Sequence, residues 1–195
     1  MFLIYDTETT GLPRDWNAPL TDFDNWPRMV QLAWQIHDEN GELVEVKNFI
    51  VKPEGYNIPF ASQKIHGIST ERAQKEGMPL DYVLNEFNEA LGKAEFVIGH
   101  NIEFDINIMG AEYLRVGDTE PITSLPSIDT KDESTEFCAI PGGKGGKFKW
   151  PKLTELHVRL FGEEFDEAHN AAADVAAAAV AATDVAAAAV AAADV

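Results

Sequence analysis

The sequence is short of cysteine and of basic residues. Its single cysteine, Cys138, excludes an internal disulfide and favours a reducing compartment, so we expect a cytoplasmic protein. Only 15 Lys and Arg stand against 33 Asp and Glu, which gives a formal net charge of −18. Because phosphate contacts normally need basic side chains, this balance argues against broad, non-specific binding to duplex nucleic acid. A site that holds metal ions, in contrast, needs an excess of carboxylates.

Long hydrophobic runs are also absent. No stretch combines the length and hydropathy of a membrane span, and the first residues lack the basic and apolar segments of a secretory signal. We therefore expect no membrane partner. With 195 residues, of which 45% are apolar and 10% aromatic, the chain is long enough to build one well-buried domain.

The order of apolar patterns predicts an α/β fold with a mixed sheet of about five strands. Asn40-Gly41 lies between two strand-like runs, which indicates a β-hairpin. Later strand-like runs alternate with helical spacing, so an antiparallel meander should be followed by parallel strands with helices packed on the sheet. The expected strands are residues 1–8, 29–37, 43–51, 96–100 and 127–130, and the expected helices lie within 60–76, 80–91, 104–114 and 153–161.

The C-terminal segment has an unusually simple composition. From residue 171 to 195 the chain uses only Ala, Val, Asp and one Thr. Alanine favours a helix, but valines that recur every five residues spiral around a helix and form no apolar stripe. Natural helices that pack on a sheet carry larger side chains on one face. We therefore draw a functional inference from this segment only at Asp174.

Two acids, Asp6 and Glu8, follow the first apolar run. Side chains alternate along a strand, so both project from the same face. Two like charges on one face repel each other, and a divalent cation relieves that repulsion because hard oxygen ligands suit Mg²⁺ and Mn²⁺. For an isolated Asp-x-Glu pair, a solvated strand end is the alternative.

Two further clusters add acids and a histidine. Asn101, Phe104 and Asp105 lie where a buried strand runs into a helix, and ligand sites gather beyond the carboxyl ends of strands. An acid in a first helical turn is also common without any catalytic role, because the helix dipole favours it. His169 and Asp174 are five residues apart and converge only if His169 precedes the last helix, with Asn170 as a candidate cap. A surface histidine is the alternative there.

Taken together and in this order, the three clusters resemble the motifs of the DEDDh family of 3′-to-5′ exonucleases, which includes the proofreading epsilon subunit of bacterial DNA polymerase III. The segment from Asp6 to Leu12 is similar to the first motif of that family, and segments around Met29, His66 and Asp129 are similar to its intervening sequences. The resemblance covers roughly residues 1–175. It implies a ribonuclease H-like exonuclease domain there. The Ala-rich stretch from residue 171 departs from the family, and its alanine content predicts that residues 176–195 form an Ala/Val-rich C-terminal helix of the same domain.

The resemblance also implies roles for individual residues. Asp6, Glu8, Asp105 and Asp174 would hold two Mg²⁺ or Mn²⁺ ions, and His169 would be the general base for the attacking water. Two metal ions can orient a phosphodiester and compensate the charge on the leaving oxygen. Histidine titrates near neutral pH and can therefore accept a proton there.

Other residues are candidates for substrate contacts. Thr9, Leu12, Asn101 and Phe104 flank the expected ligands and can contact the sugar or stack on the last base. His66 either reaches the site or fills a loop. Trp16, Trp26 and Trp150 lie in loops and can stack bases, whereas Trp34 lies in a strand and is predicted to be core. The basic stretch comprises Lys144, Lys147, Lys149 and Lys152, which either contact the nucleic-acid backbone or form a solvated loop.

Three functions remain open from the sequence. The first is a metal-dependent 3′-to-5′ exonuclease that hydrolyses single-stranded or frayed DNA to 5′-mononucleotides. Such an enzyme acts either in proofreading, with a DNA polymerase subunit as its partner, or in another process. The second keeps the chemistry but acts on RNA ends, as an exoribonuclease or oligoribonuclease. The third is an inactive nucleic-acid-binding module associated with a polymerase. Suitable residues at all five catalytic positions argue against the third.

Overall fold

A five-stranded mixed sheet, in the order β3-β2-β1-β4-β5, forms the centre of the protein. The computed structural model describes residues 1–118, 125–163 and 171–179. β1 and β2 pair antiparallel, as do β2 and β3, whereas β4 is parallel to both β1 and β5. The predicted α/β class and mixed sheet are confirmed. The strands are β1 (Phe2–Thr9), β2 (Met29–His37), β3 (Leu43–Ile50), β4 (Phe96–Gly99) and β5 (Ser127–Asp129).

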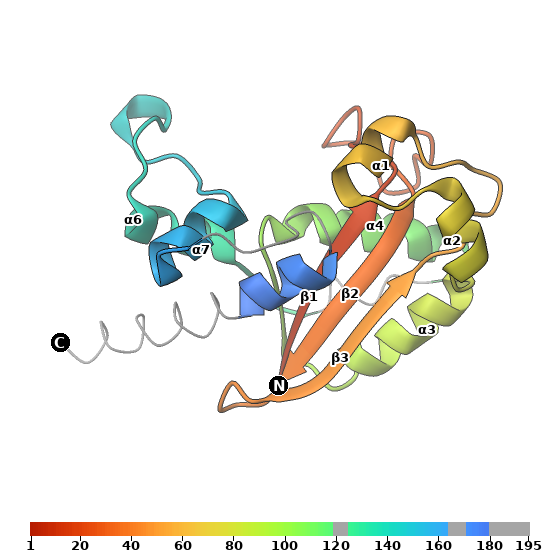
Figure 1. The fold of residues 1–195 in the computed structure, drawn as a ribbon, viewed down its shortest axis with the longest axis horizontal. Coiled ribbons are helices and arrows are strands. Elements are labelled where there is room, and N and C mark those ends of the chain that lie inside the picture. Colours follow the sequence, from red (N-terminus) through yellow and green to blue (C-terminus); the bar gives the residue numbers. More distant parts are fainter. Residues whose placement is uncertain (119–124, 164–170, 180–195) are drawn as a thin grey trace.

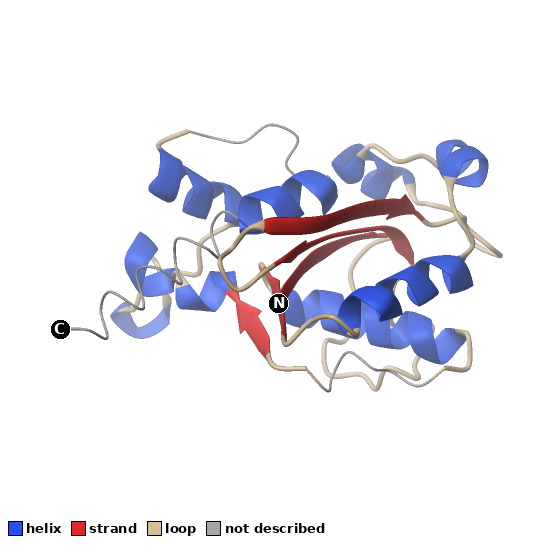
Figure 2. Ribbon diagram, turned by 90° about the horizontal axis from the view of Figure 1, so that it is seen from below, coloured by secondary structure: helices blue, strands red, loops and turns tan. Residues whose placement is uncertain are grey.

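Helices lie on both sides of the sheet (Figures 1 and 2). On one side α3 and α4 pack against it, and on the other lie α1, α2 and a helix over residues 171–179. None of the described helices is both long and apolar enough to cross a membrane. The named helices are α1 (Phe60–His66), α2 (Thr70–Glu76), α3 (Leu80–Leu91), α4 (Ile102–Arg115), α5 (Thr130–Glu133), α6 (Thr135–Cys138) and α7 (Leu153–Phe161), and a 3₁₀ turn, η2 (Lys144–Gly146), follows α6.

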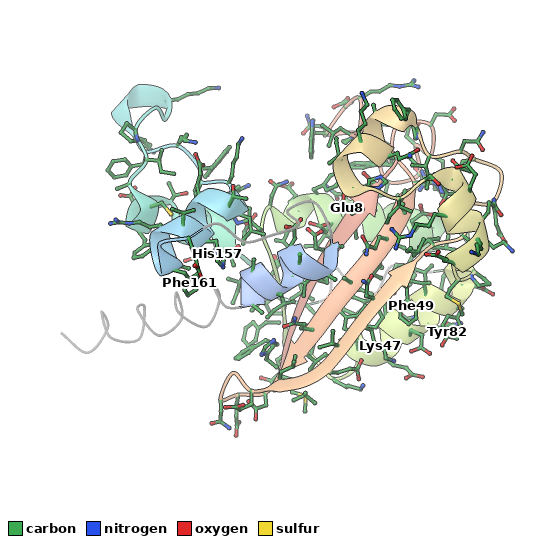
Figure 3. The ribbon with its side chains drawn as sticks, viewed as in Figure 1. Glu8, Lys47, Phe49, Tyr82, His157 and Phe161 are labelled. Atoms are coloured by element: carbon green, nitrogen blue, oxygen red, sulfur yellow. The ribbon has the colours of Figure 1, made fainter. Side chains whose placement is uncertain are left out.

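The main core lies between the sheet and the α3–α4 layer. Tyr5 of β1 and Trp34 of β2 both pack on Phe87 of α3, with ring centroids 5.1 Å and 5.4 Å apart. Figure 3 shows a second contact of the same layer, where Phe49 of β3 lies against Tyr82 of α3. Trp34 is fully buried, as its place in a strand predicts.

The helix over residues 171–179 covers part of the opposite face of the sheet. Ile4, Ala33 and Ile98 form its floor, and Ala171 and Val175 pack on them. Because side chains alternate along β1, Asp6 and Glu8 share this face with Ile4. The small side chains of the 171–179 helix let its backbone approach the sheet closely, so this packing brings Asp174 toward the end of β1.

A buried charge cluster fixes the long loop between β1 and β2 to α4. Glu112 is fully buried and accepts hydrogen bonds from Nε of Arg28 at 3.0 Å and from the backbone N–H of Met29 at 2.8 Å. It also lies 3.2 Å from Nη1 of Arg115. A buried carboxylate is tolerated only when it is paired in this way. The cluster therefore positions the loop that carries Leu12 and Trp16.

The structure differs from the sequence predictions at several short elements. α5 and α6 have four residues each and were not predicted, because so short a helix shows no hydrophobic period. The third strand ends at Ile50, and Val51 only bridges to Met78. Residues 142–146, which read as a loop, contain the 3₁₀ turn η2.

Candidate active site

Three carboxylates converge at the carboxyl end of β1. The ligand oxygens of Asp6, Glu8 and Asp174 all lie within 4.8 Å of one another. Asp6 and Glu8 come from β1, and Figure 3 shows Glu8 near the end of that strand. Asp174 comes from the 171–179 helix, 166 residues further along the chain than Glu8. Packing of this helix on the sheet therefore completes a cluster that the sequence holds in separate pieces.

Asp105 lies beside this cluster and is held by Thr7. Its carboxylate is buried, and Oδ1 accepts hydrogen bonds from the Thr7 backbone N–H at 2.9 Å and from the Thr7 hydroxyl at 2.6 Å. Asp105 occupies the first turn of α4, where the helix dipole also favours a negative charge. Thr7 thus links the strand that bears two of the acids to the helix that bears another.

Burial, together with the charges of neighbouring acids, raises the pKa values of these carboxyl groups. Burial is the largest cause for Glu8, whose pKa rises to about 8, and the charges of Asp174 and Asp105 add to it. Burial likewise raises the pKa of Asp105 to about 7, against the lowering effect of the Thr7 hydrogen bonds. The pKa of Asp6 is raised well above its ordinary value by burial first and then by Asp105, Asp174 and Glu8. Such mutual repulsion is what a divalent cation relieves, so the donor set fits a hard metal ion bound through oxygen.

A cavity of about 600 Å³ opens over these acids. Its lining combines the acidic floor with residues from the β1–β2 loop, the β4–α4 junction, α5 and the start of α7. The lining residues are Asp6, Thr7, Glu8, Leu12, His100, Asn101, Phe104, Asp105, Lys131, Pro151, Lys152, Leu153, Thr154 and Asp174.

The junction between β4 and α4 is shaped for close packing. A side chain at Gly99 would place its Cβ 2.5 Å from Cδ1 of Ile102 and 3.1 Å from the Tyr5 carbonyl oxygen, so a larger residue would require the Ile102 side chain to move. Asn101 follows with a left-handed backbone, at φ 68°, a conformation that asparagine tolerates better than most residues. Its N–H donates to Oδ1 of Asp129 at 2.8 Å, and its side-chain oxygen accepts from Nζ of Lys131 at 2.9 Å.

His100 connects this junction to the segment before α7. Its Nε2 lies 3.0 Å from the Pro151 carbonyl oxygen, and its Nδ1 lies 3.0 Å from the Thr130 hydroxyl. A carbonyl can only accept, so Nε2 carries the proton in this contact. Burial lowers the pKa of His100. The ring thereby holds one wall of the cavity in place.

The predicted substrate contacts fall into two groups. Leu12, Asn101 and Phe104 line the cavity, and Phe104 packs on Trp16 with ring centroids 5.7 Å apart. Leu12 is exposed over 71% of its surface, which leaves it available to a ligand.

Thr9 and His66 lie outside the cavity lining. The Thr9 hydroxyl donates to the Gly11 carbonyl at 2.6 Å. His66 is buried, its Nδ1 accepts from the Ile68 N–H at 3.1 Å, and its ring faces the Thr9 backbone. These two side chains brace the turn that follows β1.

The tryptophans that are candidates for base stacking differ in their exposure. Trp26, which was a candidate for base stacking, is buried in the core and donates from Nε1 to the Pro19 carbonyl at 3.2 Å, so it cannot stack on a base. Trp16 and Trp150 are exposed. His169 and Asn170 lie outside the described residues.

Sequence reasoning missed several cavity residues. Thr7 sits between the two acids of the first motif, and its polar side chain in a buried strand was the available signal. Lys131, Pro151, Leu153 and Thr154 carried no such signal, because nothing local indicates that they reach a site formed by residues 6–8 and 105. Lys152 also lines the cavity, and it belongs to the basic stretch that the sequence offered as a candidate backbone contact.

Comparisons with known proteins identify the family of the chain. The family model described as exonuclease (RNase_T) matches residues 3–181. The chain is 32% identical over 177 residues to the PolC-type DNA polymerase III of Streptococcus thermophilus, and 25% identical over 181 residues to that of Halalkalibacterium halodurans. Each alignment covers 90% of this chain but only 10% and 11% of the relative. The chain thus spans about a tenth of the length of these polymerases.

Solved structures share the fold. Escherichia coli exonuclease I in complex with a dT13 oligonucleotide superposes with a TM-score of 0.74 at 23% identity, covering 94% of this chain and 40% of that one. A product-bound structure of exonuclease I gives a TM-score of 0.71 at 21% identity, covering 93% and 42%. The matched sheet, the converging carboxylates and the family model lead to one conclusion: the chain belongs to the exonuclease family and has its ribonuclease H-like fold.

Proposed function

We propose that this chain is a divalent-metal-dependent 3′-to-5′ exonuclease that releases 5′-mononucleotides from single-stranded or frayed DNA. The observation that carries the proposal is the cluster of Asp6, Glu8 and Asp174, with oxygens within 4.8 Å of one another on the floor of a cavity in an exonuclease-family fold. The matched structure of Escherichia coli exonuclease I is a complex with a dT13 oligonucleotide, which supports DNA as the substrate.

The acids are assigned to two Mg²⁺ or Mn²⁺ ions. Asp6, Glu8, Asp105 and Asp174 would hold them, since carboxylate oxygens are their preferred ligands. When bound, the ions supply positive charge for the phosphate and lower the pKa of the attacking water. One exonuclease I structure is described as a zinc-bound form, which fits a divalent site in this fold.

The remaining site residues are assigned to the water and the nucleotide. His169 is the proposed general base that takes the proton of the attacking water. Leu12 and Phe104 are proposed to pack on the terminal base, and Asn101 to contact its sugar. Thr9 and His66 are proposed to act on the substrate through the turn that they brace beside Leu12.

The domain and its partner follow from the same assignment. We propose that residues 1–175 form the exonuclease domain and that residues 176–195 belong to the same domain. The predicted helix over 176–195 lies outside the described residues from 180 onward. Because the relatives are long polymerases in which the matched part is about a tenth of the chain, a DNA polymerase is the proposed partner and proofreading the proposed setting. A cytoplasmic location is consistent with that role.

The test is hydrolysis of a 5′-labelled single strand with Mg²⁺. We expect a ladder that shortens from the 3′ end, release of 5′-mononucleotides, and no reaction when the 3′ hydroxyl is blocked. A circular single strand should survive, and its cleavage would overturn the exonuclease assignment. Initial rates on matched DNA and RNA strands decide the substrate, and faster hydrolysis of RNA would replace DNA with RNA. Binding without hydrolysis would identify an inactive binding module.

A further inference from the structure

Trp150 is a large apolar side chain that lies exposed at the edge of the cavity. It is 65% exposed, and the next four residues, Pro151 to Thr154, all line the cavity. An exposed indole contributes little to folding, because most of its apolar surface stays in water. Its position beside the site therefore points to a ligand rather than to the core.

The indole is backed by a fixed cation. Nζ of Lys131 lies 4.6 Å from the Trp150 ring centroid, within the range of a cation–π contact. The same ammonium group donates to the side-chain oxygen of Asn101 at 2.9 Å and lies 3.6 Å from Oδ2 of Asp129. The Lys131 side chain is only 15% exposed, so its ammonium group is held in a fixed position against the ring. The ring is thereby covered on one side and open on the other.

The segment that carries Trp150 is pinned at several points. The Pro151 carbonyl lies 3.0 Å from Nε2 of His100. The Lys149 N–H donates to the Ile140 carbonyl at 2.9 Å, and its ammonium group pairs with Glu155 at 2.6 Å. A ring on a pinned segment loses little conformational entropy when it binds a ligand, which favours stacking.

The charge near Trp150 favours a phosphate chain. Among the described residues that line the cavity, the cationic side chains are Lys131 and Lys152, and Lys152 is exposed. The floor of the same cavity is acidic, and the whole chain has a formal charge of −18. Lys131 lies 3.6 Å from Asp129 and 3.9 Å from Asp132, so its charge is largely balanced. A polyanion is repelled by most of this surface and meets positive charge beside Trp150 mainly from Lys152.

We propose that Trp150, backed by Lys131, is a stacking platform for the base adjacent to the terminal nucleotide of a single strand, with Lys152 contacting the strand's phosphate. Every base presents a π face, so the platform accepts any sequence. Its ligand class is a single-stranded oligonucleotide of at least two nucleotides. The inference rests on the proposed function, because it takes the terminal nucleotide to lie over Asp6 and Glu8.

The first experiment measures binding of a 5′-dye-labelled dT10 to the full chain by fluorescence anisotropy, in Ca²⁺, which occupies oxygen sites with looser geometry. Trp150→Ala should raise Kd roughly 5- to 100-fold, the usual size of one base–aromatic stack, whereas Trp150→Phe should keep most of the affinity. The matched control is Phe23→Ala. Phe23 is also an exposed ring with a cation, Arg115, 5.4 Å from its centroid, but it does not line this cavity. Its replacement should leave Kd within about twofold.

A second arm identifies the stacked base. An abasic residue next to the 3′-terminal nucleotide should weaken binding to the unsubstituted protein by the same factor, and Trp150→Ala should cost nothing further with that strand. Additive losses, or a Trp150→Ala protein that binds dT10 normally, would overturn the platform.

A third arm separates this inference from the proposed function. The p-nitrophenyl ester of thymidine 5′-monophosphate has no second base, so Trp150→Ala should hydrolyse it at the normal rate. If the unsubstituted protein hydrolyses neither this ester nor any oligonucleotide with Mg²⁺, the proposed function fails. The anisotropy measurements with Trp150→Ala and the abasic strand then still show whether Trp150 stacks on a base. If Trp150→Ala lowers hydrolysis of the ester as much as that of dT10, the platform is wrong because the loss does not depend on a second base.

Discussion

Thr7 donates two hydrogen bonds to the same oxygen of Asp105, from its backbone N–H at 2.9 Å and from its hydroxyl at 2.6 Å. Both residues are buried, and 98 positions of sequence separate them. The contact joins β1, which presents Asp6 and Glu8, to the first turn of α4. A hydrogen bond to a buried carboxylate matters mainly through the cost of leaving it unmade.

Replacing Thr7 with Val should therefore weaken both the fold and the site. The isosteric change removes one donor from a buried carboxyl group, and we expect a loss of about 1–3 kcal/mol in the free energy of unfolding, measured with urea. Hydrolysis should also fall, since Asp105 loses its fixed orientation. Thr7→Ser keeps the hydroxyl and is the control. Equal behaviour of the Val and Ser proteins would mean that the hydroxyl does not hold Asp105.

Divalent metal should stabilise the protein through the clustered acids. Mg²⁺ should raise Tm and EDTA should abolish hydrolysis, because a ligand that binds only the folded state stabilises it. Asp6→Asn should raise Tm in EDTA, by removing a repelled charge, and should lose most of the Mg²⁺-dependent rise. Glu89→Gln is the control, because Glu89 is an exposed acid on α3 and not part of the cluster. Hydrolysis that continues at the same rate in EDTA would contradict the assignment of the acids to metal ions.

Without metal, stability should fall as pH rises across the neutral range. The folded-state pKa values of Glu8, about 8, and Asp105, about 7, lie above their ordinary values of 4.5 and 3.8. The folded protein therefore holds protons that the unfolded chain releases, so this stability is complete below about pH 4 and is lost as pH rises through about 8.

Urea midpoints in EDTA, taken from about pH 7 to about pH 9, measure this effect. Burial lowers the pKa values of His66 and His100, so above about pH 7 these histidines are largely neutral in both the folded and the unfolded chain and add no opposing trend. That window lies above the range in which acids with lowered pKa values, such as Glu155, titrate. Mg²⁺ should flatten the trend, since it replaces the protons as the partner of the carboxylates. A midpoint that rises with pH in EDTA would contradict the crowding of acids.

His169→Ala should separate catalysis from binding. If His169 is the base, turnover should fall roughly 10²–10⁴-fold, while Mg²⁺ binding survives because all four carboxylates remain. The residual rate should rise with pH as hydroxide replaces the base. His157→Ala is the control: His157 lies on α7 against Phe161, with ring centroids 4.6 Å apart (Figure 3). Near-normal turnover at neutral pH in the His169 variant would assign the proton to another group.

Much of this protein could be predicted from local sequence patterns. The alternation in β1 places Asp6 and Glu8 on one face, and Asn40-Gly41 marks the hairpin between β2 and β3, because both depend only on neighbouring residues. The C-terminal ends of α3 and α7 coincide with Gly92 and Gly162 for the same reason. Resemblance to a family then ordered the acids into one site.

Only the tertiary structure decided which distant side chains meet. Thr7 meets Asp105, and Lys131 meets Trp150, through packing of separate elements, and no local pattern encodes such distances. The same holds for burial: Trp26 and Trp150 both lie in loops of the sequence, yet one is in the core and the other 65% exposed. Periodicity reports the face of an element that is apolar, whereas the neighbour that covers that face is fixed by the whole chain.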